Sequence, residues 1–188
     1  MHVPTIRRAQ AALLLGVLLA LSAALPVSAR QYSYEAYSWN DWGSYECGAG
    51  NWIDWTAAGS GILRIRTGTG KLEGAFFAHD RFSWHATDVR RSDGVALHFA
   101  GRANFVETKA VRVDGSVFQF TAVEAGQPFS VRDDDGNLLV RDRGSIRQSI
   151  LFDTLGDGMP GGIFIEDVSF RANGPHPGFE FDACAYFG

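Results

Sequence analysis

Apolar and polar side chains alternate over most of this 188-residue chain, and this period of two restricts its fold more than any other feature. Along residues 95–105 the odd positions are apolar or small, whereas His98, Arg102 and Asn104 occupy even positions. Side chains two residues apart share one face of a β-strand, so we expect the odd face to be buried. The same parity at Val111 and Val113 leaves two alternatives, one long strand bent at Gly101 or two strands joined near residues 101–104.

Turn signals divide the alternating segments. Four Asp-Gly pairs, at 93–94, 114–115, 135–136 and 157–158, stand 21, 21 and 22 residues apart. Asp-Gly favours a two-residue hairpin turn because both residues tolerate positive φ. We expect successive Asp-Gly turns at one end of a meander of about ten to twelve strands, with return turns at residues 124–128, 142–145 and 173–178. The turn at 135–136 would set Val131 opposite Val140, and the turn at 114–115 would place four residues on one face: Val111, Val113, Phe118 and Phe120.

The predicted fold class is therefore all-β, an antiparallel meander that either closes into a β-barrel or stacks as a two-sheet β-sandwich. No segment offers ten residues of clean helical periodicity, and residues 179–186 are expected to form the last strand.

The first 29 residues are typical of a secretion signal. Arg7 and Arg8 precede an apolar stretch over residues 11–25, and the small residues 27–29 follow Pro26. Cleavage after Ala29 would leave one β domain, residues 30–188, outside the cytoplasm. The alternative, a permanent membrane anchor, would need about 20 apolar residues.

Charge limits the partners that we expect. Residues 1–29 hold two of the 17 basic residues and none of the 21 acidic ones, so the rest of the chain carries 15 basic and 21 acidic residues, a net charge of −6. Such a domain repels phosphate backbones and anionic lipid, which argues against nucleic acid and, after signal cleavage, against membranes as partners. We expect a monomer or a weakly associating protein.

Cys47 and Cys184 are the only cysteines, so one long-range disulfide is the only bridge available. Two thiols pair readily in an oxidising compartment, which agrees with export. A free nucleophilic cysteine is the alternative, although no activating base lies near either residue in the sequence.

Aromatic residues gather near the start of the predicted domain, where four of the five tryptophans occur: Trp39, Trp42, Trp52 and Trp55. Flat rings beside Asn and Asp side chains are typical of a sugar-binding surface. The alternative is that these rings belong to the core and edges of the sheet, since aromatic residues favour strands.

Loops rich in Asp and Gly offer oxygen ligands. Asp153 and Asp157 lie in one such loop and residues 133–135 form another, so the sequence allows a structural calcium ion, although neither loop has the Asp-x-Asp-x-Asp-Gly spacing. Solvated turns are the alternative, and no other cofactor is expected. His79 and His85 would share one strand face about 20 Å apart, too far to ligate one metal. No catalytic sequence pattern is present, so we name no catalytic residue.

Five short stretches, VRVDGSVF (111–118), AGQPF (125–129), VRDRG (140–144), ILFDTLG (150–156) and GPHPG (174–178), resemble segments of uncharacterised secreted proteins of high-GC Gram-positive bacteria. The resemblance covers residues 95–186. It implies an exported bacterial protein and brings no activity with it.

The sequence thus predicts a secreted binding protein for an extracellular glycan or a small apolar molecule. A secreted hydrolase that uses paired carboxylates, such as a glycosidase, is the alternative. A structural, envelope-associated protein is the second alternative.

Overall fold

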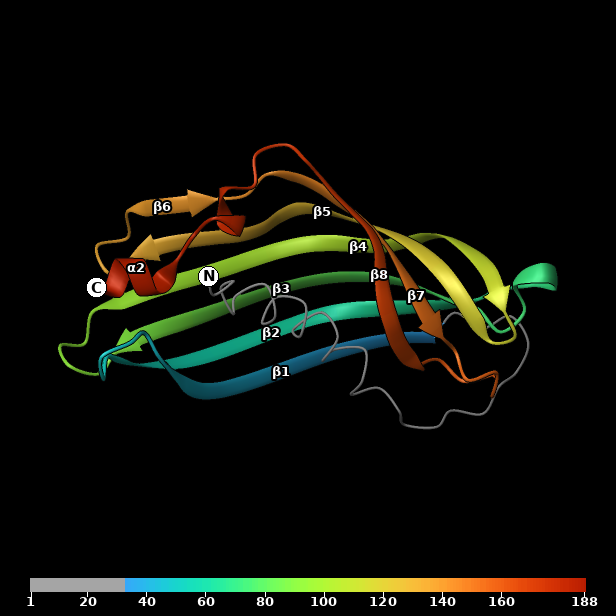
Figure 1. Ribbon diagram of the computed structural model, residues 1–188, viewed down its shortest axis with the longest axis horizontal. Helices are drawn as coiled ribbons and strands as arrows, with labels where there is room; N and C mark the ends of the chain where they lie inside the picture. The colour runs from blue at the N-terminus through green and yellow to red at the C-terminus, as the bar shows by residue number, and fades with distance from the viewer. Residues whose placement is uncertain (1–32) are drawn as a thin grey trace.

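Eight strands form one antiparallel sheet in the computed structural model, which describes residues 33–188 (Figure 1). The predicted signal, residues 1–29, lies outside the described residues. The strands are β1 (Ser33–Glu46), β2 (Trp52–Thr67), β3 (Phe76–Arg90), β4 (Ala96–Asp114), β5 (Val117–Asp133), β6 (Leu138–Arg141), β7 (Gly144–Asp153) and β8 (Ile163–Asn173). Their order is β1-β2-β3-β4-β5-β7-β8, and β6 pairs with the C-terminal end of β5. The all-β antiparallel meander is confirmed, and the sheet is not closed.

The strands are longer and fewer than the turn spacing predicted. β4 runs for 19 residues as one strand, which settles the alternatives left open at Gly101. Asp93-Gly94 lies between β3 and β4, and Asp114-Gly115 lies between β4 and β5, so these two turns are at opposite ends of β4. The expectation that successive Asp-Gly turns share one end is therefore wrong. The return turn expected at residues 124–128 is also wrong, since these residues continue β5. Residues 142–145, in contrast, do lead from β6 into β7.

Pairing around the 114–115 turn differs from the prediction by a shift in register. Asp114 pairs with Val117, and a bulge lies between Arg112 and Asp114. Val111 and Val113 are therefore 45% and 56% exposed instead of covering the phenylalanines of β5. At the next hairpin the predicted pairing of Val131 with Val140 is confirmed.

The sheet has an inner face, which is the face that the C-terminal segment covers. In register, Leu63 of β2 pairs with Asp80 of β3, Asp80 with Phe105 of β4, and Phe105 with Glu124 of β5. These residues form a row across the inner face. β7 and β8 turn away from the direction of the other strands and cross in front of them in Figure 1.

Two hydrophobic clusters lie toward opposite ends of the long strands. The first contains Ile53, Leu97, Phe129, Val131, Ala183 and Phe187. The second contains Ala75, Phe77, Ala110, Phe118 and Phe120, next to the 3-10 turn η1 (Gly70–Leu72). The row that includes Asp80 and Glu124 lies between them along the strands.

The C-terminal segment is helical, so the strand predicted over residues 179–186 is wrong. It forms η2 (Pro177–Phe179) and α2 (Ala183–Phe187). Asp182 caps α2 by accepting hydrogen bonds from the backbone N–H groups of Cys184 and Ala185, which favours a helix start over a strand. The side chain of Phe187 is fully buried in the first cluster.

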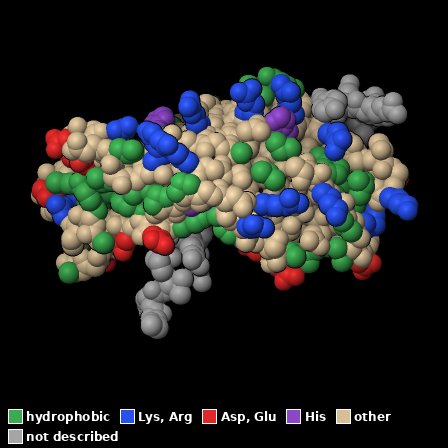
Figure 2. All heavy atoms as spheres, turned by 90° about the horizontal axis from the view of Figure 1, so that it is seen from above, with side chains coloured by type: hydrophobic (Ala, Val, Ile, Leu, Met, Phe, Trp, Pro, Cys, Tyr) green, Lys and Arg blue, Asp and Glu red, His purple; other side chains and the backbone are tan. Residues whose placement is uncertain are grey.

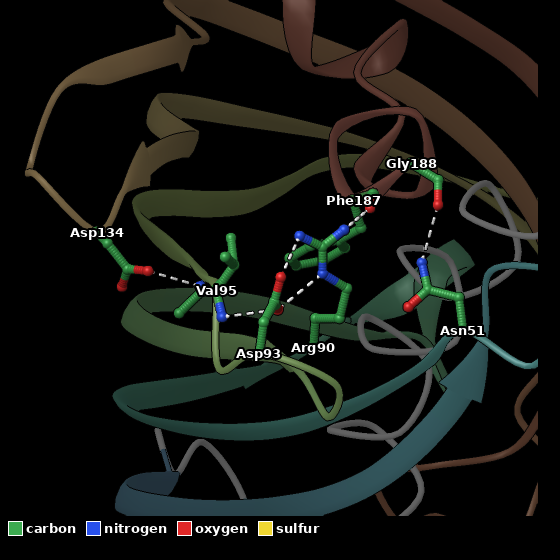
Figure 3. Close-up of polar contacts among 8 residues, drawn as sticks. Asn51, Arg90, Asp93, Val95, Asp134, Phe187 and Gly188 are labelled. Atoms are coloured by element: carbon green, nitrogen blue, oxygen red, sulfur yellow. Dashed lines mark hydrogen bonds and ion pairs between the residues drawn. The ribbon is translucent and has the colours of Figure 1, made fainter.

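Covalent and polar contacts fix α2 to the sheet. Cys47 and Cys184 form the predicted disulfide. Arg90 donates a hydrogen bond to the backbone carbonyl of Phe187 while pairing with Asp93, and the Asn51 amide donates to the carbonyl of Gly188 (Figure 3). The chain end is thereby held against the β1–β2 and β3–β4 connections.

Basic side chains are dispersed among hydrophobic and other groups on the face shown in Figure 2, with no single large basic patch. Along residues 33–188 no helix is long and apolar enough to cross a membrane.

Candidate functional site

The four tryptophans singled out in the sequence divide between the two faces of the sheet. Trp55 is an odd-numbered residue of β2, like Ile53 and Leu63, so it lies with them on the inner face. Trp39 lies on the same face because it pairs with Gly59, another odd-numbered residue of β2. Trp42 is 80% exposed and Trp52 is 41% exposed, both on the outer face. The structure therefore brings Trp39 and Trp55 together on one face and does not gather all four rings into one surface.

Aromatic rings on the inner face lie over glycines of a neighbouring strand. A Cβ atom added at Gly59 would come within 2.6 Å of the Trp39 indole, and one added at Gly43 would come within 2.8 Å of the Trp55 indole. Tyr37 and Trp84 lie in the same way over Gly61 and Gly101. Glycine permits this close approach because it has no side chain. The rings of Tyr37, Trp39 and Trp55 are only half-buried, so they form a partly accessible aromatic strip along β1 and β2.

A buried carboxyl group stands beside this strip. The Tyr37 hydroxyl donates a hydrogen bond to Oδ2 of Asp80 over 2.6 Å. The Asp80 side chain is only 8% exposed, and Oδ1 is buried without a hydrogen-bond partner among the described residues. Burial raises the pKa of Asp80, while the bond from Tyr37 lowers it. The same interaction, together with burial, raises the pKa of Tyr37.

Two further carboxyl groups project from the inner face of the neighbouring strands. Burial raises the pKa of Glu107 to about 7, and its carboxylate accepts a hydrogen bond from the backbone N–H of Ala78 over 2.6 Å. Burial also raises the pKa of Glu124 to about 7, with a further rise from the negative charge of Asp80 and an opposing effect of His176. The charge of Asp80 acts on Glu124, and Glu107 lies on β4, the strand between theirs; these three carboxyl groups on adjacent strands are called the acidic cluster below.

His176 and Asp142 lie close to this acidic cluster. Their side chains are 4% and 2% exposed, and His176 Nδ1 lies 3.6 Å from Asp142 Oδ2, beyond hydrogen-bond distance. Asp142 Oδ1 accepts a hydrogen bond from the backbone N–H of Gly178, which anchors the turn that contains His176. The influence of His176 on the pKa of Glu124 shows that the C-terminal segment contributes to the electrostatics of the inner face.

A second hydroxyl–carboxyl pair lies closer to α2. The Tyr45 hydroxyl donates to Oδ2 of Asp88 over 2.6 Å. Burial raises the pKa of both groups, and the bond from Tyr45 opposes the rise at Asp88. This pair packs beside the first hydrophobic cluster, which includes Tyr45 at its margin, so it belongs to the covered end of the sheet.

The outer face carries a shallow open depression around Trp42. Its polar lining comes from Asn40, Asp41, Thr56 and His85. The pairing of Asn40 with Ala58 and of Ala58 with His85 brings these residues together from β1, β2 and β3. This depression is a second place where an exposed ring is flanked by groups that form hydrogen bonds.

The carboxylates considered as calcium ligands serve the loops that contain them. Asp153 Oδ1 accepts hydrogen bonds from the Ser116 hydroxyl and the Leu155 backbone N–H, and these bonds lower the pKa of Asp153. Asp157 accepts one from the backbone N–H of Met159. Within residues 33–188, no group of three or more His, Cys, Asp or Glu side chains is arranged to hold a metal ion.

Sequence reasoning did not single out the acidic cluster, although a signal for it was present. Asp80 has the same parity as Ala78 and Phe82, and Glu124 the same parity as Phe120 and Ala122. A carboxylate at a core-facing position of a period-two pattern is unusual, because burying its charge costs free energy. The sequence alone could therefore have identified Asp80 and Glu124 as carboxylates at core-facing positions.

Comparison with known proteins gives no relative: the chain matches no protein-family model, no curated protein and no solved structure. The fold and the inner face together define an open antiparallel β-meander domain with a partly buried acidic cluster beside an aromatic strip.

Proposed function

We propose that this protein binds a neutral glycan on the inner face of its sheet. The observation that carries the proposal is the aromatic strip of Tyr37, Trp39 and Trp55, which lies over glycines and adjoins the buried carboxyl of Asp80. Pyranose rings present C–H groups that pack on aromatic faces, and their hydroxyls donate hydrogen bonds to carboxylates. Oδ1 of Asp80 has no hydrogen-bond partner among the described residues but is fully buried, so a sugar hydroxyl would reach it only if binding opened this side chain to the ligand.

The charge of the inner face selects among glycans. Once Glu107 and Glu124 lose their protons above about pH 7, they would repel a uronic acid or a sulfated sugar, since like charges in a poorly solvated site interact strongly. A neutral oligosaccharide avoids this cost. The rings also accept a small apolar molecule, but such a ligand would leave the carboxyl groups without partners.

We also propose that the protein acts outside the cytoplasm. The Cys47–Cys184 disulfide supports export, because structural disulfides persist in oxidising compartments. The signal-like residues 1–29 support the same conclusion.

Calorimetric titration with cellohexaose, xylohexaose and chitohexaose tests the binding proposal, with polygalacturonate as the anionic comparison. We expect at least one neutral oligosaccharide to bind and the anionic polymer not to bind. Trp39→Ala should weaken binding about tenfold or more, the usual effect of truncating an aromatic anchor. Trp42→Ala is the matched control, because it removes an indole from the same strand but from the outer face.

The outer depression makes the control informative. If Trp42→Ala abolishes binding while Trp39→Ala has no effect, the glycan site belongs to the outer face with Asn40, Thr56 and His85. If the wild-type protein binds none of the sugars but binds a fluorescent fatty acid, the ligand is apolar and the glycan proposal is wrong. Melting temperatures of both variants show whether a loss of binding reflects unfolding.

A further inference from the structure

The outer face of the first four strands carries basic side chains and no acidic ones. These strands pair with one another without a register shift, so alternate residues of each strand share a face. The outer face holds the even-numbered residues 34–44 and 56–66, the odd-numbered residues 79–87 and the even-numbered residues 98–106, and none of these is Asp or Glu. Four exposed arginines at these positions define what we call the basic face: Arg64, Arg66, Arg81 and Arg102.

Three of these arginines follow a diagonal across neighbouring strands. Arg64 pairs with His79, and Arg81 lies two residues further along β3. Arg81 pairs with Asn104, and Arg102 lies two residues away on β4, in the same direction across the sheet. Diagonal neighbours on one face of a sheet are about 7–8 Å apart, so the three guanidinium groups can contact one extended anionic surface together.

The arginines of the basic face form no ion pair within residues 33–188. Both ion pairs that arginine makes in this part of the chain lie beyond the end of the face. Carboxylates occur only at its margins, where Asp134 lies 3.4 Å from His98 and where Asp41 lines the depression beside Trp42. What distinguishes the face is thus a set of separate, unneutralised positive charges, which are open to an external anion.

Large apolar side chains are exposed on the same face. Trp42 is 80% exposed, Tyr34 60% and Ile62 36%. The guanidinium of Arg64 lies 5.3 Å from the ring centre of Tyr34, its cross-strand partner. Ile62 pairs with Arg81. Aromatic and aliphatic groups interleaved with basic ones are typical of surfaces that bind at a bilayer interface, whereas a soluble polyanion would leave these apolar groups in water.

We propose that the basic face docks on a bilayer that contains anionic lipid, with Arg64, Arg81 and Arg102 contacting the headgroups. Trp42 and Ile62 enter the interfacial region beside them. This contact is independent of glycan binding, and it turns the inner face away from the bilayer, because the two faces lie on opposite sides of one sheet.

The net charge of the protein does not oppose this contact. The value of −6 for residues 30–188 (15 basic and 21 acidic residues) sums both sides of the sheet, and the acidic cluster lies on the inner face. Charges more than about 10 Å from the lipid are largely screened at physiological ionic strength. The side that touches the bilayer therefore decides whether it is attracted.

Cosedimentation with vesicles tests the proposal on protein recovered after export. One set of vesicles is pure phosphatidylcholine, and the other holds equal parts of phosphatidylcholine and phosphatidylglycerol. We expect binding to the second set only, with an affinity that falls as sodium chloride is added, because salt screens the attraction. Wild type and variants share one amino terminus, so residues 1–29 cannot account for a difference between them.

Arg81→Gln combined with Arg102→Gln should weaken binding to the anionic vesicles about 25-fold, since each basic residue at an anionic surface contributes about 1 kcal/mol, or about fivefold in affinity. Lys71→Gln combined with Arg143→Gln is the matched control. It removes the same charge from exposed positions outside the basic face, so it should keep the wild-type affinity. Trp42→Ala should weaken binding about tenfold at every salt concentration, because the indole contributes burial and not charge.

The other outcomes overturn the proposal. Equal binding to both kinds of vesicle, or to neither, would show that the arginines do not form a docking face for anionic lipid. An equal loss in the two double variants would show that net charge controls binding and not this face. Single-stranded DNA or polygalacturonate that binds more tightly than the vesicles, through the same arginines, would identify a soluble polyanion as the partner instead. All the substituted side chains are exposed, so the melting temperatures of the variants should match that of the wild type.

Discussion

Tyr37 on β1 reaches Asp80 on β3 by passing over Gly61 of β2, the strand between them. The pairing of Tyr37 with Gly61 places the phenol ring where any other residue would have its Cβ atom. The hydrogen bond that holds the buried carboxyl therefore depends on a glycine that takes no part in it.

Gly61→Ala tests this dependence. The added methyl group would collide with the Tyr37 ring, so we expect a loss of about 1–3 kcal/mol of unfolding free energy, as in other overpacked sites. Ser60→Ala, on the exposed outer side of the same strand, should change stability by less than about 0.5 kcal/mol. Urea denaturation measures both, and equal midpoints for the two variants would contradict the proposed contact.

The stability of the protein should fall as pH rises from about 4.5 to about 7. Glu107 and Glu124 have pKa values raised to about 7 in the folded protein, against 4.5 for an unperturbed Glu. Between these values the folded state binds more protons than the unfolded state, so raising the pH favours unfolding. Each carboxyl should contribute on the order of 2–3 kcal/mol to this loss.

Denaturation midpoints at several pH values measure the effect. Glu107→Gln should flatten the slope, since a Gln side chain can still accept the hydrogen bond from Ala78 but does not titrate. Glu166→Gln, at an exposed site, should keep the wild-type slope. Stability that rises steadily over this interval would show that the two carboxyl groups are not buried as described.

Phe187 should contribute far more to stability than its neighbour Tyr186. The Phe187 side chain is fully buried in the first hydrophobic cluster, whereas Tyr186 is 41% exposed. Truncating a buried Phe usually costs about 3–5 kcal/mol, so Phe187→Ala should be severely destabilising. Tyr186→Ala should cost about 1 kcal/mol or less, and a similar cost for both would mean that α2 does not pack on the sheet in solution.

Reducing the disulfide should destabilise the protein by about 2–5 kcal/mol, the usual effect for a native bridge. Cys47 and Cys184 are 137 residues apart, so the bridge restricts most of the unfolded chain. Thermal unfolding with and without dithiothreitol measures the difference. A Cys47→Ala, Cys184→Ala double variant should reproduce the reduced protein and be insensitive to the reductant, and unchanged melting after reduction would contradict the prediction.

The parts of the fold that sequence could predict are those in which local pattern and turn chemistry agree. The odd face of residues 95–105 is the covered one, with Leu97 fully buried and His98 exposed. Val131 pairs with Val140 as the 135–136 turn required. At the 114–115 turn a single bulge displaced the pairing, and since side chains alternate with period two, Val111 and Val113 became exposed.

Short elements and distant pairs could not be read from the pattern. The five residues of α2 are too few to show helical periodicity, and only the capping side chain of Asp182 marks its start. Asp80 and Glu124 come together through the register of β3, β4 and β5, which no local signal specifies. The sequence could mark each carboxylate as core-facing, but only the fold identifies them as neighbours.

The two edges of the sheet differ in how well they could receive another strand. β1 keeps unbroken register with β2 over 14 consecutive pairs, from Ser33 to Glu46, and its other edge pairs with no strand among residues 33–188. β8 is joined to β7 through two register shifts. Such irregularities in an edge strand discourage strand addition, whereas charged residues occur on both edge strands. Association through strand edges at high concentration should therefore begin at β1, and pairing of β1 with β1 of a second molecule would give a closed dimer instead of a growing fibril.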